Sequence, residues 1–231
     1  IYTICIQAAK LCPSKSAVDN RAMHQTTSQL SNADLREIMT ADEALWSALK
    51  DARILVTGAT GFFGRWLLES FAYINREQAL GASLVAVTRD PEAFRHAAPH
   101  LANDPAISLH RSDVRHFQAP VGNFTHIIHA ATESCGAQQQ HTALHMVETI
   151  IDGTRHVLDF AKAQGRPRVL YVSSGAIYGA ARTEPMQEND NTSPRAGEAN
   201  IEYSESKRMA EALCQLYHRS WDIPITIARG F

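Results

Sequence analysis

The sequence predicts an α/β protein built on a doubly wound parallel sheet with helices on both faces. From residue 52 onward, short apolar runs alternate with longer amphipathic segments. That alternation is typical of βαβ units around a buried parallel sheet. A second observation is a turn with three glycines, which directly follows the first apolar run and opens a helical segment. Together they indicate a Rossmann-like domain, whose ligands bind at the carboxyl ends of the strands.

Composition is that of an ordinary globular protein. The 231 residues are 45% hydrophobic, and 22 Lys and Arg nearly balance 24 Asp and Glu. No basic block of useful length appears, so neither a nucleic acid nor an anionic membrane surface is expected as a partner. The apolar stretch Ile1–Ala9 is too short to span a bilayer and lacks the basic region of a secretory signal.

Four cysteines are spread along the chain without a CxxC pair or accompanying histidines at zinc-site spacing: Cys5, Cys12, Cys135 and Cys214. Neither a disulfide framework nor a metal site is therefore predicted. Reduced thiols are typical of a cytoplasmic protein, which is the expected location.

The first 50 residues form an N-terminal extension of different character. We expect residues 1–33 to be irregular, because they are rich in Ser, Thr, Asn and Gln, and we assign them no function. Residues 34–49 carry apolar side chains near a 3.6-residue period and predict one helix, capped by Asn32 or Asp34. Its apolar face is expected to pack on the domain that follows, residues 51–231.

Within that domain the pattern predicts six strands and four helices. The expected strands are Arg53–Thr57, Leu84–Arg89, Ile107–His110, His126–Ala130, Val169–Ser173 and Ile225–Arg229. The expected helices lie near Phe62–Asn75, Glu92–Leu101, Thr142–Gln164 and Tyr203–Ser220.

The glycine turn carries the first functional prediction. Gly58, Gly61 and Gly64 follow the strand Arg53–Thr57 and lead into a helix. Glycine permits the tight turn and lets a pyrophosphate approach the backbone, while the amides and dipole at the helix start attract negative charge. The context favours dinucleotide binding. The alternative is a tight turn with a purely structural role.

Five segments in order resemble extended short-chain dehydrogenases, the family that contains nucleotide-sugar epimerases and dehydratases. The first is TGATGFFG, with its GxxGxxG spacing. The others are Ser112-Asp113-Val114, His129-Ala130-Ala131-Thr132, SSGAIYG at residues 173–179, and Tyr203-x-x-x-Lys207. The resemblance covers about residues 52–231.

This resemblance implies a set of NAD(P)-binding residues. Besides the glycines, it includes Thr60, Phe62, Phe63, Arg89, Asp113, Val114, Ala130, Ala131, Thr132, Tyr203 and Lys207. Asp113 and Val114 would flank the adenine, with the carboxylate accepting from its amino group. Ala130 and Ala131 would lie beside the nicotinamide ribose. The alternative for Asp113 is a turn cap.

The end of the second strand bears on the choice between NAD and NADP. A carboxylate there accepts from the ribose 2′-hydroxyl, whereas an arginine pairs with a 2′-phosphate. Arg89 stands where NAD-binding relatives usually have the acid, which favours NADP. Two alternatives stay open: Asp90 binds the hydroxyl after a shift of the turn, or Arg89 is only an exposed loop charge.

The reaction centre is predicted on the last helix and the fifth strand. Tyr203 and Lys207 are four residues apart and share a helix face, so the ammonium would stabilise the phenolate of a tyrosine acting as general acid and base. By the family pattern, the catalytic hydroxyl that binds the reacting oxygen is that of Ser174. Ser173 is interpreted as a structural hydroxyl at the strand end.

Two further positions bear on the reaction type. Sugar 4,6-dehydratases of the family carry Asp-Glu directly after the catalytic hydroxyl, whereas this chain has Gly175 and Ala176. That difference favours an epimerase or a keto-sugar reductase. Glu133 is a candidate second proton-transfer group, with a solvated loop carboxylate as the alternative.

The leading hypothesis is an NAD(P)-dependent enzyme that transfers hydride at a sugar hydroxyl or keto carbon of a nucleotide sugar. The alternatives are an NADPH-dependent reductase of a non-sugar carbonyl and a non-catalytic dinucleotide-binding module. The resemblance also implies a C-terminal substrate domain, which is largely absent from these 231 residues, so that the chain alone is expected to bind cofactor without full turnover. It further implies a homodimer through the helices 142–164 and 203–220.

Overall fold

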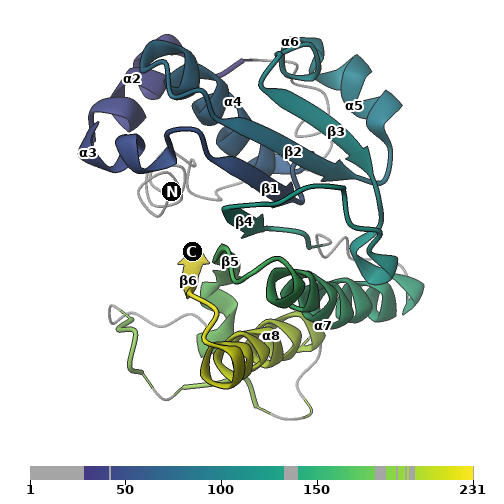
Figure 1. Ribbon diagram of the computed structural model, residues 1–231. Helices are drawn as coiled ribbons and strands as arrows, with labels where there is room; N and C mark the ends of the chain where they lie inside the picture. The colour runs from purple at the N-terminus through teal and green to yellow at the C-terminus, as the bar shows by residue number, and fades with distance from the viewer. Residues whose placement is uncertain are drawn as a thin grey trace. The chain divides into compact units, whose positions relative to one another are not determined.

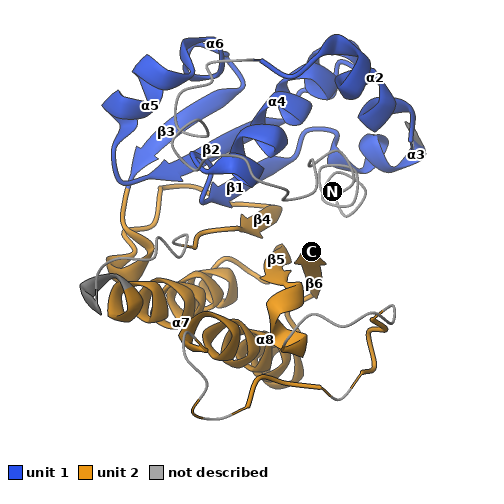
Figure 2. Ribbon diagram, turned by 180° about the vertical axis from the view of Figure 1, so that it is seen from behind, with its two compact units in different colours: residues 1–111 blue, residues 112–231 orange. Residues whose placement is uncertain are grey.

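The computed structural model describes residues 29–41, 43–132, 140–179, 186–190, 192–195, 197 and 201–230. The chain forms two compact units, residues 1–111 and residues 112–231 (Figure 2). Each unit contains three parallel strands with helices packed against them. The predicted fold class, a doubly wound parallel α/β fold, is confirmed.

In the first unit the strands lie in the order β3-β2-β1. They are β1 (Arg53–Thr57), β2 (Ser83–Thr88) and β3 (Ile107–Arg111). Leu55 pairs with Val85, which in turn pairs with Ser108. The middle residues of β1 and β2 are buried, as expected for parallel strands covered on both faces. In parallel sheets of this kind, ligands bind at the carboxyl ends of the strands, and the turns that follow β1 and β2 lie at those ends.

The first unit's helices are α4 (Phe62–Glu77), α5 (Pro91–Ala97) and α6 (Pro99–Ala102) (Figure 1). The expectation of one helix from Glu92 to Leu101 was wrong, because the helix breaks at Ala98. Its φ of −143° and ψ of 64° lie outside the helical region. The proline ring at position 99 excludes a helical conformation for the residue before it, and this explains the break.

The N-terminal extension differs from the single helix that the periodicity predicted. The chain forms α2 (Asn32–Thr40), α3 (Glu43–Trp46) and a 3₁₀ turn, η2 (Ser47–Leu49). The cap of α2 is Ser31, whose hydroxyl accepts from the Asp34 amide, and not Asn32 or Asp34. The Trp46 indole donates to the Met39 carbonyl at 2.8 Å, a contact that requires the chain to turn back on itself.

Packing of the extension on the following domain is confirmed. α2 contacts α4, and the Leu30 amide donates to the Glu69 carboxylate of α4 at 2.9 Å. Leu35 and Ile38 of α2 are buried. The extension thus belongs to the first unit, although residues 1–28 lie outside the described part.

In the second unit the strands lie in the order β4-β5-β6. They are β4 (His126–His129), β5 (Arg168–Ser174) and β6 (Ile225–Gly230). The long helices α7 (Gln140–Ala163) and α8 (Glu202–Trp221) run side by side (Figure 1). Two 3₁₀ turns, η3 (Val114–His116) and η4 (Gly175–Tyr178), connect these elements. Among the described helices, none is long and apolar enough to cross a membrane.

Candidate functional site: a glycine turn and a buried lysine

The glycine turn in the first unit joins the end of β1 to the start of α4. Gly58 has a φ of 71°, in the left-handed region that favours glycine, and its carbonyl accepts from the Gly61 amide at 3.2 Å. Gly61 is the N-cap of α4 and provides no side chain to bind the first amides of the helix. The first turn of α4 contains no acidic residue. A helix start of this kind can bind an anion through its backbone amides.

The three glycines are required for different reasons. A Cβ at Gly64 would overlap the backbone of Gly58 and Ala59, so this position permits the close approach of α4 to the turn. Gly61 has an ordinary φ of −76°, and the nearest described atom to an added Cβ is the Gly58 carbonyl oxygen at 3.5 Å. Neither backbone conformation nor packing within the described residues therefore demands glycine at position 61.

The other predicted residues of this turn lie on its outer side. Thr60 and Phe62 are exposed, and Phe63 is half-buried. The rings of Phe62 and Phe63 pack edge to face, with centroids 5.7 Å apart. The turn thus presents backbone and aromatic surface together.

The carboxyl ends of β2 and β3 bring two arginines together. Arg89 follows β2 and is exposed, and the guanidinium of Arg111, at the end of β3, donates to its carbonyl oxygen at 3.4 Å. Asp90 is the N-cap of α5, where its carboxylate accepts from the Ala93 amide at 3.0 Å. Of Arg89 and Asp90, the two residues considered for binding the ribose at the end of β2, Asp90 thus caps a helix. Sequence reasoning missed Arg111, because only the pairing of β2 with β3 brings it to Arg89.

In the second unit, Asp113 is the N-cap of η3. Its carboxylate accepts from the Arg115 amide at 2.9 Å and from the Arg115 guanidinium at 2.7 Å. Val114 is buried against Gly153 of α7, where a Cβ would lie only 2.8 Å from the valine side chain. The turn-cap role considered as the alternative for Asp113 is therefore present in this structure.

The segment after β4 contains the small residues expected beside a cofactor ribose. Ala130 is half-buried, Ala131 is buried and Thr132 is exposed. His129, the last residue of β4, is buried, and its Nε2 lies 3.1 Å from the Thr154 hydroxyl of α7. Burial, together with a smaller contribution from the nearby Lys207 charge, lowers the pKa of His129 to about 3. Glu133, the candidate second proton-transfer group, lies outside the described residues.

The carboxyl end of β5 presents two adjacent serines with different surroundings. Ser173 is buried and its hydroxyl donates to the Glu211 carboxylate at 2.5 Å, so its predicted structural role is confirmed. Ser174 is half-buried, ends β5 and caps η4, with its hydroxyl accepting from the Ala176 amide at 3.2 Å. That hydroxyl retains its own proton to donate.

Tyr203 and Lys207 lie one turn apart on α8. The Lys207 Nζ is 5.9 Å from the centroid of the Tyr203 ring and donates to the Val172 carbonyl of β5 at 2.8 Å. The Lys207 side chain is only 2% exposed. Burial lowers the pKa of Lys207 to about 8, while Cys214 and Glu211 act to raise it.

The sequence reasoning missed the ion pair next to these residues. Glu211 of α8 and Arg229 of β6 form an ion pair, with Nη2 of the arginine 2.8 Å from the carboxylate. A signal was available: Glu211 lies four residues after Lys207, on the helix face that carries it, and that face packs on the sheet. Arg229 ends the predicted sixth strand, where a long charged side chain needs a partner.

The fold and these residues define a doubly wound α/β protein with a glycine turn after its first strand and a Tyr-x-x-x-Lys helix. The chain belongs to the NAD dependent epimerase/dehydratase family, whose family model matches residues 54–231.

Among curated proteins, the chain is 30% identical to UDP-glucuronic acid decarboxylase 1 of Arabidopsis thaliana, covering 79% of this chain and 40% of that protein. It is 25% identical to dTDP-glucose 4,6-dehydratase of Streptomyces antibioticus, covering 76% of this chain and 52% of the relative. The chain therefore spans about half, or less, of the length of these relatives.

Solved structures share the fold at lower identity. A crystal structure of UDP-galactose 4-epimerase matches with a TM-score of 0.60 at 24% identity, over 77% of this chain and 55% of that one. UDP-glucuronic acid 4-epimerase from Bacillus cereus, in complex with UDP-glucuronic acid and NAD, matches with a TM-score of 0.61 at 20% identity, over 76% and 55%.

Proposed function

We propose that this protein is an NAD(P)-dependent oxidoreductase that acts on a nucleotide sugar, transferring hydride at a ring hydroxyl or keto carbon. The observation that carries the proposal is the buried Lys207 ammonium, held by a β5 carbonyl beside the ring of Tyr203. Burying a charged lysine costs free energy, which hydrogen bonding only partly offsets, so a functional role explains its burial. The proximity of the Lys207 amine to the Tyr203 ring supports a role in stabilising the phenolate.

The cofactor assignment rests on the glycine turn. Neither the φ of Gly61 nor its described neighbours require a glycine at this position. We therefore infer that the glycine leaves room for a bound group, which an added Cβ would obstruct. A dinucleotide pyrophosphate suits this position, because the uncapped start of α4 offers amides and a favourable dipole. Gly58, Thr60, Phe62, Phe63 and Gly64 would complete the binding turn.

Preference for NADP is proposed from the two arginines at the ends of β2 and β3. The Arg111 guanidinium donates to the Arg89 backbone carbonyl, so both arginines belong to this end of the sheet, and the adjacent carboxylate of Asp90 caps α5. A 2′-phosphate would bind guanidinium groups through charge-assisted hydrogen bonds. The Bacillus cereus structure named above holds NAD, so this preference would distinguish the present chain from that protein.

Proton transfer is assigned to Tyr203. An unperturbed tyrosine has a pKa of about 10 and is a weak base at neutral pH. The Lys207 ammonium favours the phenolate, so that the phenolic oxygen takes a proton from a substrate hydroxyl or returns it to a keto oxygen. A bound nicotinamide would supply the hydride acceptor or donor.

Ser174 is assigned to the reacting oxygen. Its hydroxyl accepts from the Ala176 amide, which orients the oxygen and leaves the hydroxyl proton to donate. A donated hydrogen bond stabilises the negative charge that develops on a substrate oxygen. Gly175 and Ala176, which follow Ser174, offer no acid or base for water elimination, and they favour epimerisation or keto-group reduction over 4,6-dehydration.

An NADPH-dependent reductase of a non-sugar carbonyl is the second candidate, and the arginine pair favours it, because reductive steps commonly use NADPH. A non-catalytic dinucleotide-binding module is less well supported. Such a module needs no buried lysine beside a tyrosine. The three candidates differ in the substrate that they convert: a nucleotide sugar, a non-sugar carbonyl, or none. Measurements of binding and turnover therefore distinguish them.

The test combines cofactor binding with turnover. The purified protein is titrated with NADPH and NADH by nicotinamide fluorescence. Turnover is measured on a full-length protein that also carries the substrate domain implied by the family resemblance: it is incubated with UDP-glucuronic acid, UDP-galactose or dTDP-glucose while products are followed by mass spectrometry and NMR. We expect dinucleotide binding and conversion of at least one nucleotide sugar. Binding with turnover only of simple ketones would favour the reductase, and no dinucleotide binding would overturn the proposal.

A homodimer through α7 and α8 is also proposed. Val157 and Leu158 of α7 are buried within the unit, whereas Leu144 of α7 is 61% exposed and Leu216 of α8 is 45% exposed. Two neighbouring helices that expose large apolar side chains are a suitable surface for a second copy of the chain.

A further inference from the structure

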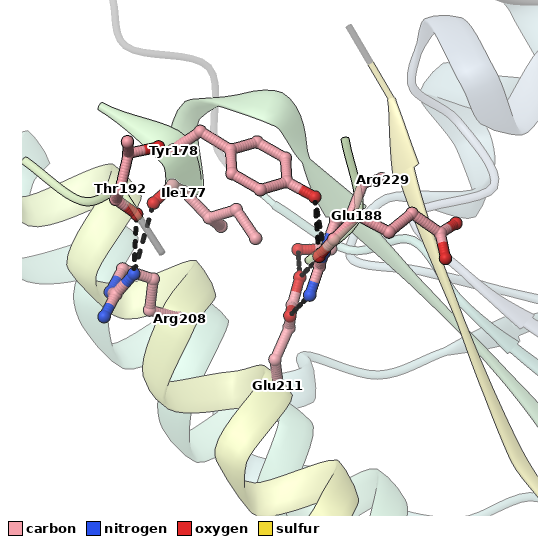
Figure 3. Close-up of polar contacts among 8 residues, drawn as sticks. Ile177, Tyr178, Glu188, Thr192, Arg208, Glu211 and Arg229 are labelled. Atoms are coloured by element: carbon pink, nitrogen blue, oxygen red, sulfur yellow. Dashed lines mark hydrogen bonds and ion pairs between the residues drawn. The ribbon is translucent and has the colours of Figure 1, made fainter. Parts of the chain in front are cut away.

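A group of buried polar contacts joins α8 to two strands of the second unit. The Glu211 carboxylate accepts from the Ser173 hydroxyl of β5 at 2.5 Å, and from Nε and Nη2 of Arg229 of β6 at 3.1 and 2.8 Å. Figure 3 shows Glu211 rising from α8 to meet the guanidinium of Arg229. One carboxylate thus connects three elements.

Arg229 extends these contacts to the turn after β5. Its Nη1 donates to the Tyr178 hydroxyl of η4 and to the Glu188 carbonyl at 3.1 Å (Figure 3). The guanidinium carbon also lies 5.2 Å from the centroid of the Tyr178 ring. Arg229 therefore contacts the last residue of η4, while Glu211 binds Ser173, which precedes Ser174 and the start of η4.

Lys207 is attached to the same strand by a neighbouring contact. Its Nζ donates to the Val172 carbonyl, while Glu211, one helical turn later, binds the side chain of Ser173. Val172 and Ser173 are the two residues that precede Ser174. Two successive turns of α8 are thus bound to two successive residues of β5.

We infer that Glu211 is a positioning residue, whose contacts with Ser173 and Arg229 set α8 against β5 and so determine where the Lys207 ammonium and the Tyr203 phenol lie. This inference rests on the proposed function of Tyr203, Lys207 and Ser174. Glu211 itself acts through the helix, because its carboxylate is occupied by a hydroxyl and a guanidinium and is buried.

The ionic character of the contact supports a positioning role. The Glu211 carboxylate is buried and the Arg229 side chain is 27% exposed. Even partial burial of an ion pair costs desolvation energy, and a well-packed apolar pair of similar size would often be as stable. Charge-assisted hydrogen bonds, however, have a defined direction and length, and a bidentate carboxylate–guanidinium pair adds geometric specificity. A geometric requirement therefore explains the charged pair better than stability alone.

The first test measures the protection of Lys207 and needs no catalysis. The protein is treated with a low concentration of acetic anhydride, and acylation of each lysine is followed by peptide mass spectrometry, with the exposed Lys50 as internal reference. We expect Glu211→Gln to raise the relative acylation rate of Lys207 by about tenfold, because a loosened helix opens locally more often. The Glu211→Asp variant should recover part of the protection.

The second test measures turnover of UDP-glucuronic acid, UDP-galactose or dTDP-glucose, whichever the parent protein converts. We expect Glu211→Gln to lower kcat by about tenfold with a dinucleotide KM within about twofold of the parent, because geometry at the phenol changes while cofactor contacts remain. Ser173→Ala, which removes a single hydroxyl, should show the same pattern to a smaller extent and serves if Glu211→Gln does not fold.

Glu205→Gln is the matched control. Glu205 lies on the same helix and also pairs with an arginine, Arg208, at 3.7 Å, but the two side chains are 47% and 42% exposed. This variant should match the parent in both tests. Unchanged Lys207 acylation and unchanged kcat in folded Glu211→Gln and Ser173→Ala would overturn the inference. If no form converts a nucleotide sugar, the proposed function fails, whereas the acylation result still decides whether Glu211 anchors Lys207.

Discussion

A Cβ on Gly64 would overlap the backbone of Ala59, whereas one on Gly61 would meet only an ordinary contact with Gly58. The two glycines of one turn therefore serve different purposes.

We expect Gly64→Ala to lower the free energy of unfolding by about 1–3 kcal/mol, since the helix start must move. Gly61→Ala should leave stability nearly unchanged and weaken dinucleotide binding by about tenfold or more, equivalent to about 1.4 kcal/mol. Urea unfolding and fluorescence titration measure the two effects, and tight binding by Gly61→Ala would contradict the assignment.

The arginines at the strand ends predict a charge-dependent cofactor preference. Arg89→Gln and Arg111→Gln should each weaken NADPH binding by about ten- to a hundredfold, the effect of losing a hydrogen bond to a charged group, and leave NADH binding nearly unchanged. NADPH affinity of the parent should also fall with added salt. Arg95→Gln, which removes an exposed arginine paired with Glu92 on α5, is the control. Equal affinity of the parent for both nucleotides would refute the NADP preference, while dinucleotide binding itself would stand.

Removal of the phenolic hydroxyl should abolish most turnover and spare cofactor binding. We expect Tyr203→Phe to lower kcat by about 10²–10⁴-fold, the usual contribution of a general acid or base. Ser174→Ala should reduce kcat with little effect on the dinucleotide dissociation constant, because the proposed role of its hydroxyl is to bind the substrate oxygen. Steady-state rates with the converted nucleotide sugar provide the measurement. Unaltered turnover by Tyr203→Phe would remove this residue from the mechanism.

Burial of His129 predicts a stability change in mild acid. Its pKa is about 3 in the folded protein and about 6.5 when unfolded, so between these values only the unfolded chain takes up the proton. Stability from this residue is therefore present above pH 6.5 and is lost as the pH falls toward 3. From pH 7 to pH 5 the loss should be about 2 kcal/mol.

This loss is measured as the difference between the parent and His129→Gln in urea unfolding at both pH values. The same substitution at His96, an exposed histidine of α5, controls for the removal of an imidazole. If the parent and His129→Gln lose stability equally between pH 7 and pH 5, the imidazole is not held neutral by burial.

Self-association is predicted through the exposed leucines of α7 and α8. Light scattering should give the parent a mass near twice the 25.5 kDa of the chain, and Leu144→Glu or Leu216→Glu should shift it toward the monomer. Val121→Glu, at a loop position that is 92% exposed, should have no effect. A parent that remains monomeric at all concentrations would exclude the dimer under these conditions.

Much of the fold was predictable because its signals are local. Each of the six strands begins and ends within one residue of its predicted bounds, since buried parallel strands are short apolar runs between turns. The predicted helix starts at Phe62 and Tyr203 likewise fall within one residue of those found. The break at Ala98 was missed, although Pro99 marks it in the sequence.

The candidate site was predictable only in part. Residue types at fixed spacing, such as the three glycines or the pair Tyr203 and Lys207, identify chemistry because turns and helices have fixed local geometry. The cap formed by Asp113 and the helix-capping role of Asp90 required coordinates, since a carboxylate in a turn has several available partners.

By itself, the sequence determined the six strands and their succession along the chain, the position of the glycine turn and the shared helix face of Tyr203 and Lys207. Only the tertiary structure decided that Lys207 is buried on a β5 carbonyl, that Arg111 reaches Arg89, and that Glu211 binds both Ser173 and Arg229. The physical reason is that such partners are up to 38 residues apart along the chain. Their contact depends on how the strands and helices pack together. A pattern of neighbouring residues does not contain that information.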